Sequence, residues 1–115
     1  MLIACTSRET NSEIQWITVE QLDNFIEQHS PRIIDIRTPR EYRTGHIAGS
    51  LNIPLNQLEE GLREIPSDQP VLIYCNTQNR VQIGARIMRG MNFEKLYILE
   101  GGYQALRSAN YPLQQ

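Results

Sequence analysis

Short runs of apolar, mostly β-branched residues recur along the chain, and stretches with helical periodicity separate them. The clearest run is 71–74, which contains no polar residue, and similar runs lie at 32–36 and 95–99. Shorter runs lie at 16–17 and 50–53. Strands that are apolar throughout and alternate with helices are typical of parallel sheets buried on both faces. We therefore expect an α/β fold with a central parallel sheet and helices on both faces.

Capping residues and apolar spacing predict the helices between these runs. Thr18 opens a capping box with Gln21, and apolar residues then recur on one helical face. Thr38 and Pro39 begin a short helix, because proline is favoured in a first helical turn. Further helices are expected from Pro54 through Leu62, over 80–89 with Gly90 as the cap, and over 103–109.

The composition indicates one ordinary globular domain. The chain has 115 residues, of which 40% are hydrophobic and 21% charged, enough to form a single core. We expect a flexible lead-in at 1–13, polar from Thr6, and a folded domain at 14–115. The sequence lacks a run of about 18 apolar residues, which predicts no transmembrane segment. A formal net charge of -2 without a basic patch predicts no nucleic-acid partner.

The two cysteines, Cys5 and Cys75, are too few for a disulfide framework. The two histidines lie at no spacing typical of metal ligands, so we expect no metal site. Residues 2–5 resemble a bacterial lipobox, although only Met1 precedes them and a signal peptide needs a basic and an apolar stretch there. We expect a cytoplasmic protein. The alternative is a periplasmic or envelope lipoprotein, if Cys5 belongs to a truncated lipobox.

Cys75 stands where chemistry is expected in such a fold. It ends the most apolar strand and precedes the polar residues 76–80. Ligands of open parallel sheets bind beyond the carboxyl ends of strands. Loop amides and a helix N-terminus at this point favour a thiolate, and Arg80 adds a positive charge. By this local pattern alone, Cys75 is either a nucleophile or a core cysteine.

Three stretches of the chain match motifs of a known family. The first stretch comprises residues 35–37, 41–42 and 45–54, which read D-I-R, E-Y and G-H-I-A-G-S-L-N-I-P. The second is the loop from Cys75 to Arg80, and the third is G-G-Y-Q-A at 101–105. Together they resemble the rhodanese sulfurtransferase family. The resemblance implies the rhodanese-like three-layer fold with a five-stranded parallel sheet. It also implies transfer of sulfane sulfur from a donor such as thiosulfate to a thiol or cyanide acceptor, with no cofactor.

The same resemblance assigns roles to individual residues. Cys75 would carry the sulfur as a persulfide, and Arg80 would steer an anionic donor. Asp35, Arg37 and Glu41 would support the site, mainly as structure and with Arg37 paired to Glu41. Substrate would bind at the amides and side chains of the loop residues Asn76, Thr77, Gln78, Asn79 and Arg80. Since the loop has no glycine, we expect Asn76 or Asn79 to adopt a positive φ.

Two other functions fit parts of this pattern. Tyrosine phosphatases and arsenate reductases also use a cysteine in an anion-binding loop closed by arginine, but they place five residues between the two, whereas this chain places four. A rhodanese-like binding or regulatory module with weak catalysis is the other alternative. Such inactive modules usually lack the cysteine that this chain keeps.

Overall fold

The computed structural model describes residues 14–115, which form a five-stranded parallel sheet in the order β1-β5-β4-β2-β3. The strand β4, which is the most apolar, lies at the centre, and all of its residues are buried. The parallel sheet predicted from the apolar runs is confirmed. Its strands are β1 (Gln15–Ile17), β2 (Arg32–Asp35), β3 (Leu51–Asn52), β4 (Val71–Tyr74) and β5 (Leu96–Leu99).

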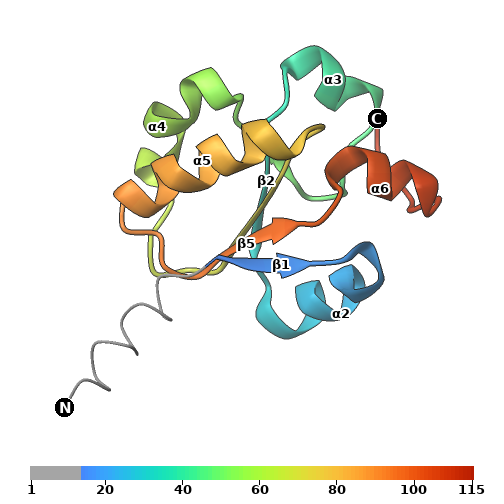
Figure 1. Ribbon diagram of the computed structural model, residues 1–115, viewed down its shortest axis with the longest axis horizontal. Helices are drawn as coiled ribbons and strands as arrows, with labels where there is room; N and C mark the ends of the chain where they lie inside the picture. The colour runs from blue at the N-terminus through green and yellow to red at the C-terminus, as the bar shows by residue number, and fades with distance from the viewer. Residues whose placement is uncertain (1–13) are drawn as a thin grey trace.

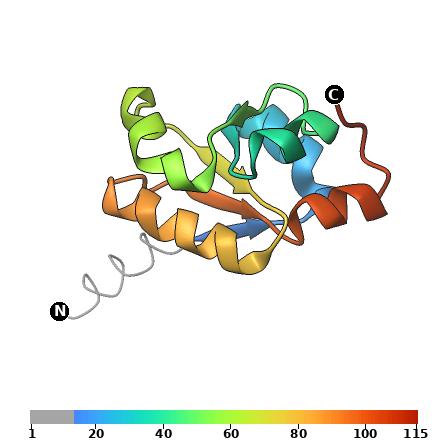
Figure 2. The same ribbon diagram turned by 90° about the horizontal axis from the view of Figure 1, so that it is seen from above.

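Helices cover both faces of the sheet, as Figures 1 and 2 show. Ile73 of β4 shares one core with Met88 of α5 and Leu58 of α4, while Leu72 shares the other with Leu22 of α2 and Leu106 of α6. Neighbouring side chains of β4 thus face opposite layers, as a strand requires. The helices are α2 (Val19–His29), α3 (Pro39–Thr44), α4 (Leu58–Gly61), α5 (Gln78–Gly90) and α6 (Gly102–Ser108), with the 3-10 helices η1 (Leu55–Gln57) and η2 (Leu62–Glu64) flanking α4.

Two helices begin with reciprocal capping boxes. The Thr18 hydroxyl accepts from the Gln21 amide at 3.2 Å, and the Gln21 side chain accepts from the Thr18 amide at 3.0 Å. Thr38 and Glu41 form the same pair of bonds at the start of α3, at 3.2 and 3.0 Å. Each box satisfies amides that have no partner within the helix. At α3 the box also holds the Glu41 carboxylate at the carboxyl end of β2.

The helix α5 differs from its prediction at both ends. It begins at Gln78 rather than near Arg80, because the Thr77 hydroxyl accepts the Arg80 amide at 3.3 Å and caps the helix two residues earlier. It continues through Gly90, which was expected to be the cap, and Met91 is the C-cap instead. The left-handed residue that follows is Asn92, with φ of 72°.

Among residues 14–115, no helix combines the length and the apolar character needed to cross a bilayer. The expectations about the segment 1–13 and about the lipobox at Cys5 lie outside the described residues.

Candidate active site

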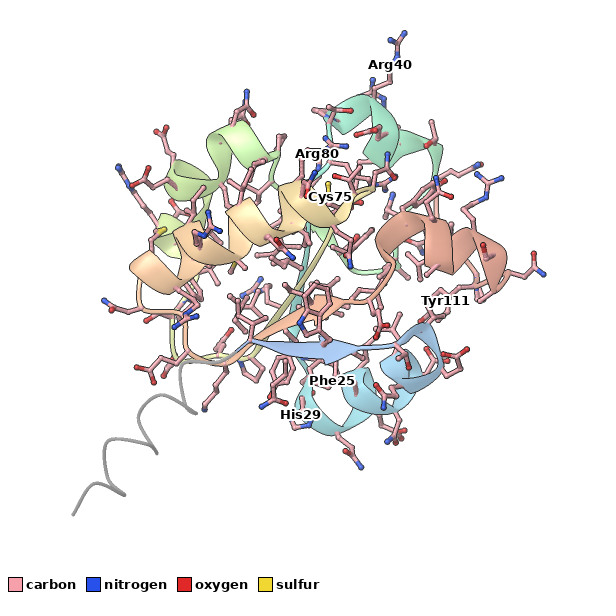
Figure 3. All side chains as sticks on the ribbon, in the orientation of Figure 1. Phe25, His29, Arg40, Cys75, Arg80 and Tyr111 are labelled. Atoms are coloured by element: carbon pink, nitrogen blue, oxygen red, sulfur yellow. The ribbon has the colours of Figure 1, made fainter. Side chains whose placement is uncertain are left out.

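The cysteine predicted to be the nucleophile directly follows β4 at the carboxyl edge of the sheet (Figure 3). The Cys75 side chain is 2% exposed and packs in the same core cluster as Ile36 and Val81. Its carbonyl oxygen accepts the Tyr103 amide at 3.0 Å. Cys75 is therefore held by both the strand before it and the helix α6 beside it.

Gly102, the first residue of α6, lets this helix approach the backbone of Cys75 closely. A Cβ atom on Gly102 would lie 2.0 Å from the Cys75 carbonyl oxygen, and the φ of Gly102 is +56°. Any side chain at this position would displace the backbone of Cys75, since real contacts never become so short. The glycine pair found in the sequence thus sets the position of the cysteine, a contact that the sequence did not reveal.

The loop after Cys75 is shorter than expected. Asn76 and Thr77 alone separate Cys75 from α5, so Gln78, Asn79 and Arg80 occupy the first turn of the helix. The expected positive φ at Asn76 or Asn79 is wrong: the only non-glycine residues of 14–115 with positive φ are Ser30, Asn92 and Asn110. The first turn of α5 provides the curvature of this segment without a positive φ. Its first amides, those of Gln78 and Asn79, have no carbonyl one turn earlier to bond within the helix.

A carboxylate from α3 joins the two polar side chains that flank this loop. The Glu41 Oε2 atom accepts the Asn76 side-chain amide at 2.7 Å and lies 3.8 Å from a guanidinium nitrogen of Arg80. The Arg80 and Glu41 side chains are 34% and 32% exposed. The other polar atom of Asn76, Oδ1, is buried and accepts no bond from any described residue. This half-open cluster lies at the solvent-facing side of residues 76–80, which we call the entrance to Cys75.

The Glu41 carboxylate is held in its charged form. Partial burial would raise its pKa, but the hydrogen bonds from the backbone and hydroxyl of Thr38 and the charge of Arg80 outweigh that effect. The pKa of Glu41 therefore lies below its ordinary value. At neutral pH the carboxylate remains available to both Asn76 and Arg80.

A second acid–base pair lies deeper at the same edge. Arg37 donates to both carboxylate oxygens of Asp35, at 2.6 and 2.9 Å to the nearest nitrogens, and also to the Gly45 carbonyl at 2.6 Å. Both side chains are buried. The expected pairing of Arg37 with Glu41 is therefore wrong, because Asp35 is two residues away along the chain and offers a bidentate partner.

This buried pair also organises its aromatic neighbours. The Arg37 guanidinium stands over the Tyr103 ring at 4.1 Å. The Tyr74 hydroxyl accepts the Ile47 amide at 3.0 Å, and burial, followed by the charge of Asp35, raises the pKa of Tyr74. Asp35 and Arg37 thus build the scaffold beneath the site.

The His46 side chain contacts Tyr42 and, among residues 14–115, forms no hydrogen bond with Cys75 or with a carboxylate. Its ring stacks on Tyr42 at 3.7 Å between ring centroids, and its Nδ1 atom bonds to the Tyr42 carbonyl oxygen at 2.8 Å. Within the part of the chain that the structure describes, no three His, Cys, Asp or Glu residues are grouped to hold a metal ion.

The folded part of the chain is similar to a known protein family. A family model described as a rhodanese-like domain matches residues 18–109. The chain belongs to the rhodanese-like family. The family and fold that the motifs predicted are therefore confirmed.

Individual proteins are similar to this rhodanese-like chain in sequence or in structure. The thiosulfate sulfurtransferase GlpE of Pseudomonas putida is 30% identical over 101 residues, which cover 88% of this chain and 91% of that protein. An uncharacterized protein of Bacillus subtilis, YqhL, is 40% identical over 73 residues, which cover 64% of this chain and 58% of that protein. The crystal structure of a rhodanese-related protein from Thermoplasma volcanium superposes with a TM-score of 0.77 at 26% identity, covering 87% of this chain and 97% of that one.

The predicted site residues divide into three groups in this rhodanese-like fold. Asn76, Arg80 and Glu41 meet at the entrance to Cys75, while Asp35 and Arg37 lie buried beneath it. Thr77 caps α5, and Gln78 and Asn79 are exposed on its first turn. The sequence suggested neither the contact of Glu41 with Asn76 nor an apolar groove beside Arg80. The one available signal for the groove was Ile83, an isoleucine on a helix face that carries Arg80 and Ile87.

Proposed function

We propose that this chain is a sulfurtransferase that carries sulfane sulfur as a persulfide on Cys75. The observation that carries the proposal is the placement of Cys75 between the carboxyl end of β4 and the N-terminus of α5. The similarity to proteins named thiosulfate sulfurtransferase supports it. Thiosulfate is the proposed donor, and a small thiol, a protein thiol or cyanide is the proposed acceptor.

The reaction has two displacement steps. In the first, the Cys75 thiolate attacks the outer sulfur of thiosulfate, the sulfur–sulfur bond of the donor breaks, and sulfite leaves. In the second, an acceptor thiolate attacks the outer sulfur of the persulfide, and the Cys75 thiolate leaves. Each step exchanges one sulfur–sulfur bond for another or for a bond to the acceptor, so no external oxidant is required.

The surroundings of Cys75 suit an anionic intermediate. The outer sulfur of a persulfide lies about 2 Å beyond Sγ, so the reacting atom would lie farther from the Cys75 backbone than the thiolate does. The partial positive charge at the start of α5 and the unbonded amides of Gln78 and Asn79 would stabilise it there. Arg80 would attract the donor, and Glu41 would hold both Arg80 and Asn76 at the entrance. The exposed side chain of Gln78 would narrow that entrance.

Mass spectrometry after incubation with thiosulfate tests the proposal. Wild type should gain about 32 Da, the mass of one sulfur atom, and lose it again when cyanide is added. Cys75→Ser should gain nothing and should lose all transfer activity, because a serine hydroxyl forms no persulfide. The matched control, Cys5→Ser, should keep both the adduct and most of the activity.

Two results would contradict the assignment. An adduct that survives in Cys75→Ser but disappears in Cys5→Ser would place the nucleophile elsewhere. Hydrolysis of an aryl phosphate by wild type, without the adduct, would favour the phosphatase alternative. We also propose the cytoplasm as the location, because acceptor thiols stay reduced there.

A further inference from the structure

An apolar groove begins at Arg80 and runs along α5. It has a volume of about 500 Å³. One wall is the exposed face of α5, and the other is the segment around η1 that follows β3. Its apolar side chains are Ile36, Pro54, Leu55, Ile83 and Ile87, and among residues 14–115 Arg80 is the only charged residue that lines it.

The charge lies at the end of the groove that is nearest to Cys75. Arg80 is in the first turn of α5, and Ile83 and Ile87 follow it on the same face, one and two turns further on. Arg80 contacts Glu41, which in turn bonds to Asn76, the residue after Cys75. A ligand in this groove would therefore have its anionic end beside the entrance to Cys75 and an uncharged body leading away from it.

The length of the groove sets the size of that body. Arg80 and Ile87 are seven positions apart, which corresponds to about 10 Å along the helix axis. An extended alkyl chain with bonds of about 1.5 Å advances roughly 1.3 Å per carbon, so six to eight carbons fill this length. Ile83, at the middle of the groove, is 46% exposed although it is isoleucine. Covering it with such a chain would remove apolar surface from water.

We propose that this groove binds the sulfur acceptor, and that the acceptor is a thiol at the end of a linear aliphatic chain of about six to eight carbons. The proposal rests on the proposed function and names the class of its acceptor. The acceptor's thiolate lies at Arg80 and attacks the outer sulfur of the Cys75 persulfide. The acceptor leaves as a new persulfide, and the Cys75 thiolate is regenerated with atoms and charge balanced.

A single-turnover experiment tests the groove after the persulfide has formed. The protein is loaded with thiosulfate, freed of donor, and mixed with 3-mercapto-1-propanol, 6-mercapto-1-hexanol or 8-mercapto-1-octanol. The discharge rate is followed as the loss of about 32 Da. Each methylene buried in a half-open groove should raise the rate constant about twofold to fourfold, so the hexanol should exceed the propanol by about tenfold or more.

Substitutions of two similarly exposed apolar residues, Ile83 and Leu51, provide the comparison. Ile83→Ser should flatten the dependence on chain length, so that the rates with 6-mercapto-1-hexanol and 8-mercapto-1-octanol fall toward that with 3-mercapto-1-propanol. Leu51→Ser should keep the full dependence, because Leu51 is 43% exposed but lies on β3, outside the groove. Equal rates for all three thiols in wild type would overturn the proposal, as would a chain-length dependence that persists in Ile83→Ser.

A binding measurement separates failure of the groove from failure of the chemistry. Octanoate and butyrate, whose carboxylates imitate the thiolate end, are titrated while the methyl NMR signals of the isoleucines are followed. Octanoate should shift the Ile83 and Ile87 signals and bind at least tenfold more tightly than butyrate, and Ile83→Ser should remove that difference. A missing persulfide would refute the proposed function alone, whereas equal affinity for octanoate and butyrate would refute the groove.

Discussion

Two carboxylate–arginine pairs stand at the same edge of the sheet and differ in almost every physical respect. Asp35 and Arg37 are 0% and 1% exposed, and their charged atoms are 2.6 Å apart. Glu41 and Arg80 are about one third exposed, and their charged atoms are 3.8 Å apart. The first pair is bidentate, and its arginine also bonds to a backbone carbonyl. In the second, the carboxylate bonds to Asn76 and Thr38 as well.

The difference shows which pair can exchange its partner. A buried charge that loses its counter-ion has no water to replace it, so Asp35 and Arg37 must stay together. A half-exposed arginine at a long distance from its carboxylate can bind an incoming anion at little cost. The buried pair therefore acts as scaffold, and the open pair is suited to meet the donor. Three substitutions test this distinction, in order of decreasing expected effect.

The largest effect is expected from Arg37→Met, which leaves the buried Asp35 carboxylate without its partner. We expect the free energy of unfolding to fall by about 3–5 kcal/mol, measured by urea denaturation. The control Arg40→Met, an exposed arginine on α3, should change it little. If the double variant Asp35→Leu/Arg37→Met were as unstable as the single variant, the loss would come from packing rather than from the unpaired charge.

Arg80→Ala should affect activity rather than stability. Loss of a charge-assisted contact costs about 1.5–3 kcal/mol, so kcat/KM for thiosulfate should fall about 10–150-fold. Arg80→Lys should recover part of the lost kcat/KM, because the lysine ammonium group supplies the charge without the planar fork of a guanidinium. Steady-state kinetics with thiosulfate measures this. Unchanged kinetics in Arg80→Ala would remove the distinction between the two pairs.

The smallest effect is expected from Glu41→Gln, on the pH dependence of the free energy of unfolding. Because the folded protein lowers the pKa of Glu41 below its ordinary value of 4.5, the charged carboxylate stabilises the fold above that pH. This contribution should disappear as the pH falls from 4.5 through the lower folded value. Glu41→Gln should therefore show a shallower loss of unfolding free energy in that acidic range. If the free energy of unfolding fell with pH equally in wild type and Glu41→Gln, the pair of Glu41 and Arg80 would contribute nothing measurable to stability.

Local signals in the sequence predicted most of the fold because they act over a few residues. Thr18 and Thr38 cap helices through hydroxyls that reach amides three residues away, and both caps form as predicted. At α5 the prediction was wrong by two residues. Thr77 was treated as part of an anion-binding loop, yet its hydroxyl caps the helix. The expected left-handed asparagine was wrong for the same reason, because a helical turn needs no positive φ.

The sequence by itself determined the alternation of strands and helices, the burial of the apolar strand before Cys75, and the motifs that mark the family. Each of these depends on residue type and spacing along the chain. Only the tertiary structure decided which arginine pairs with which carboxylate, how closely Gly102 approaches Cys75, and that Arg80 opens onto an apolar groove. Some of these contacts join segments that are distant in sequence. Others pair an arginine with one of several carboxylates that have the same chemistry. Their geometry depends on how the sheet and its helices pack, and residue spacing does not encode it.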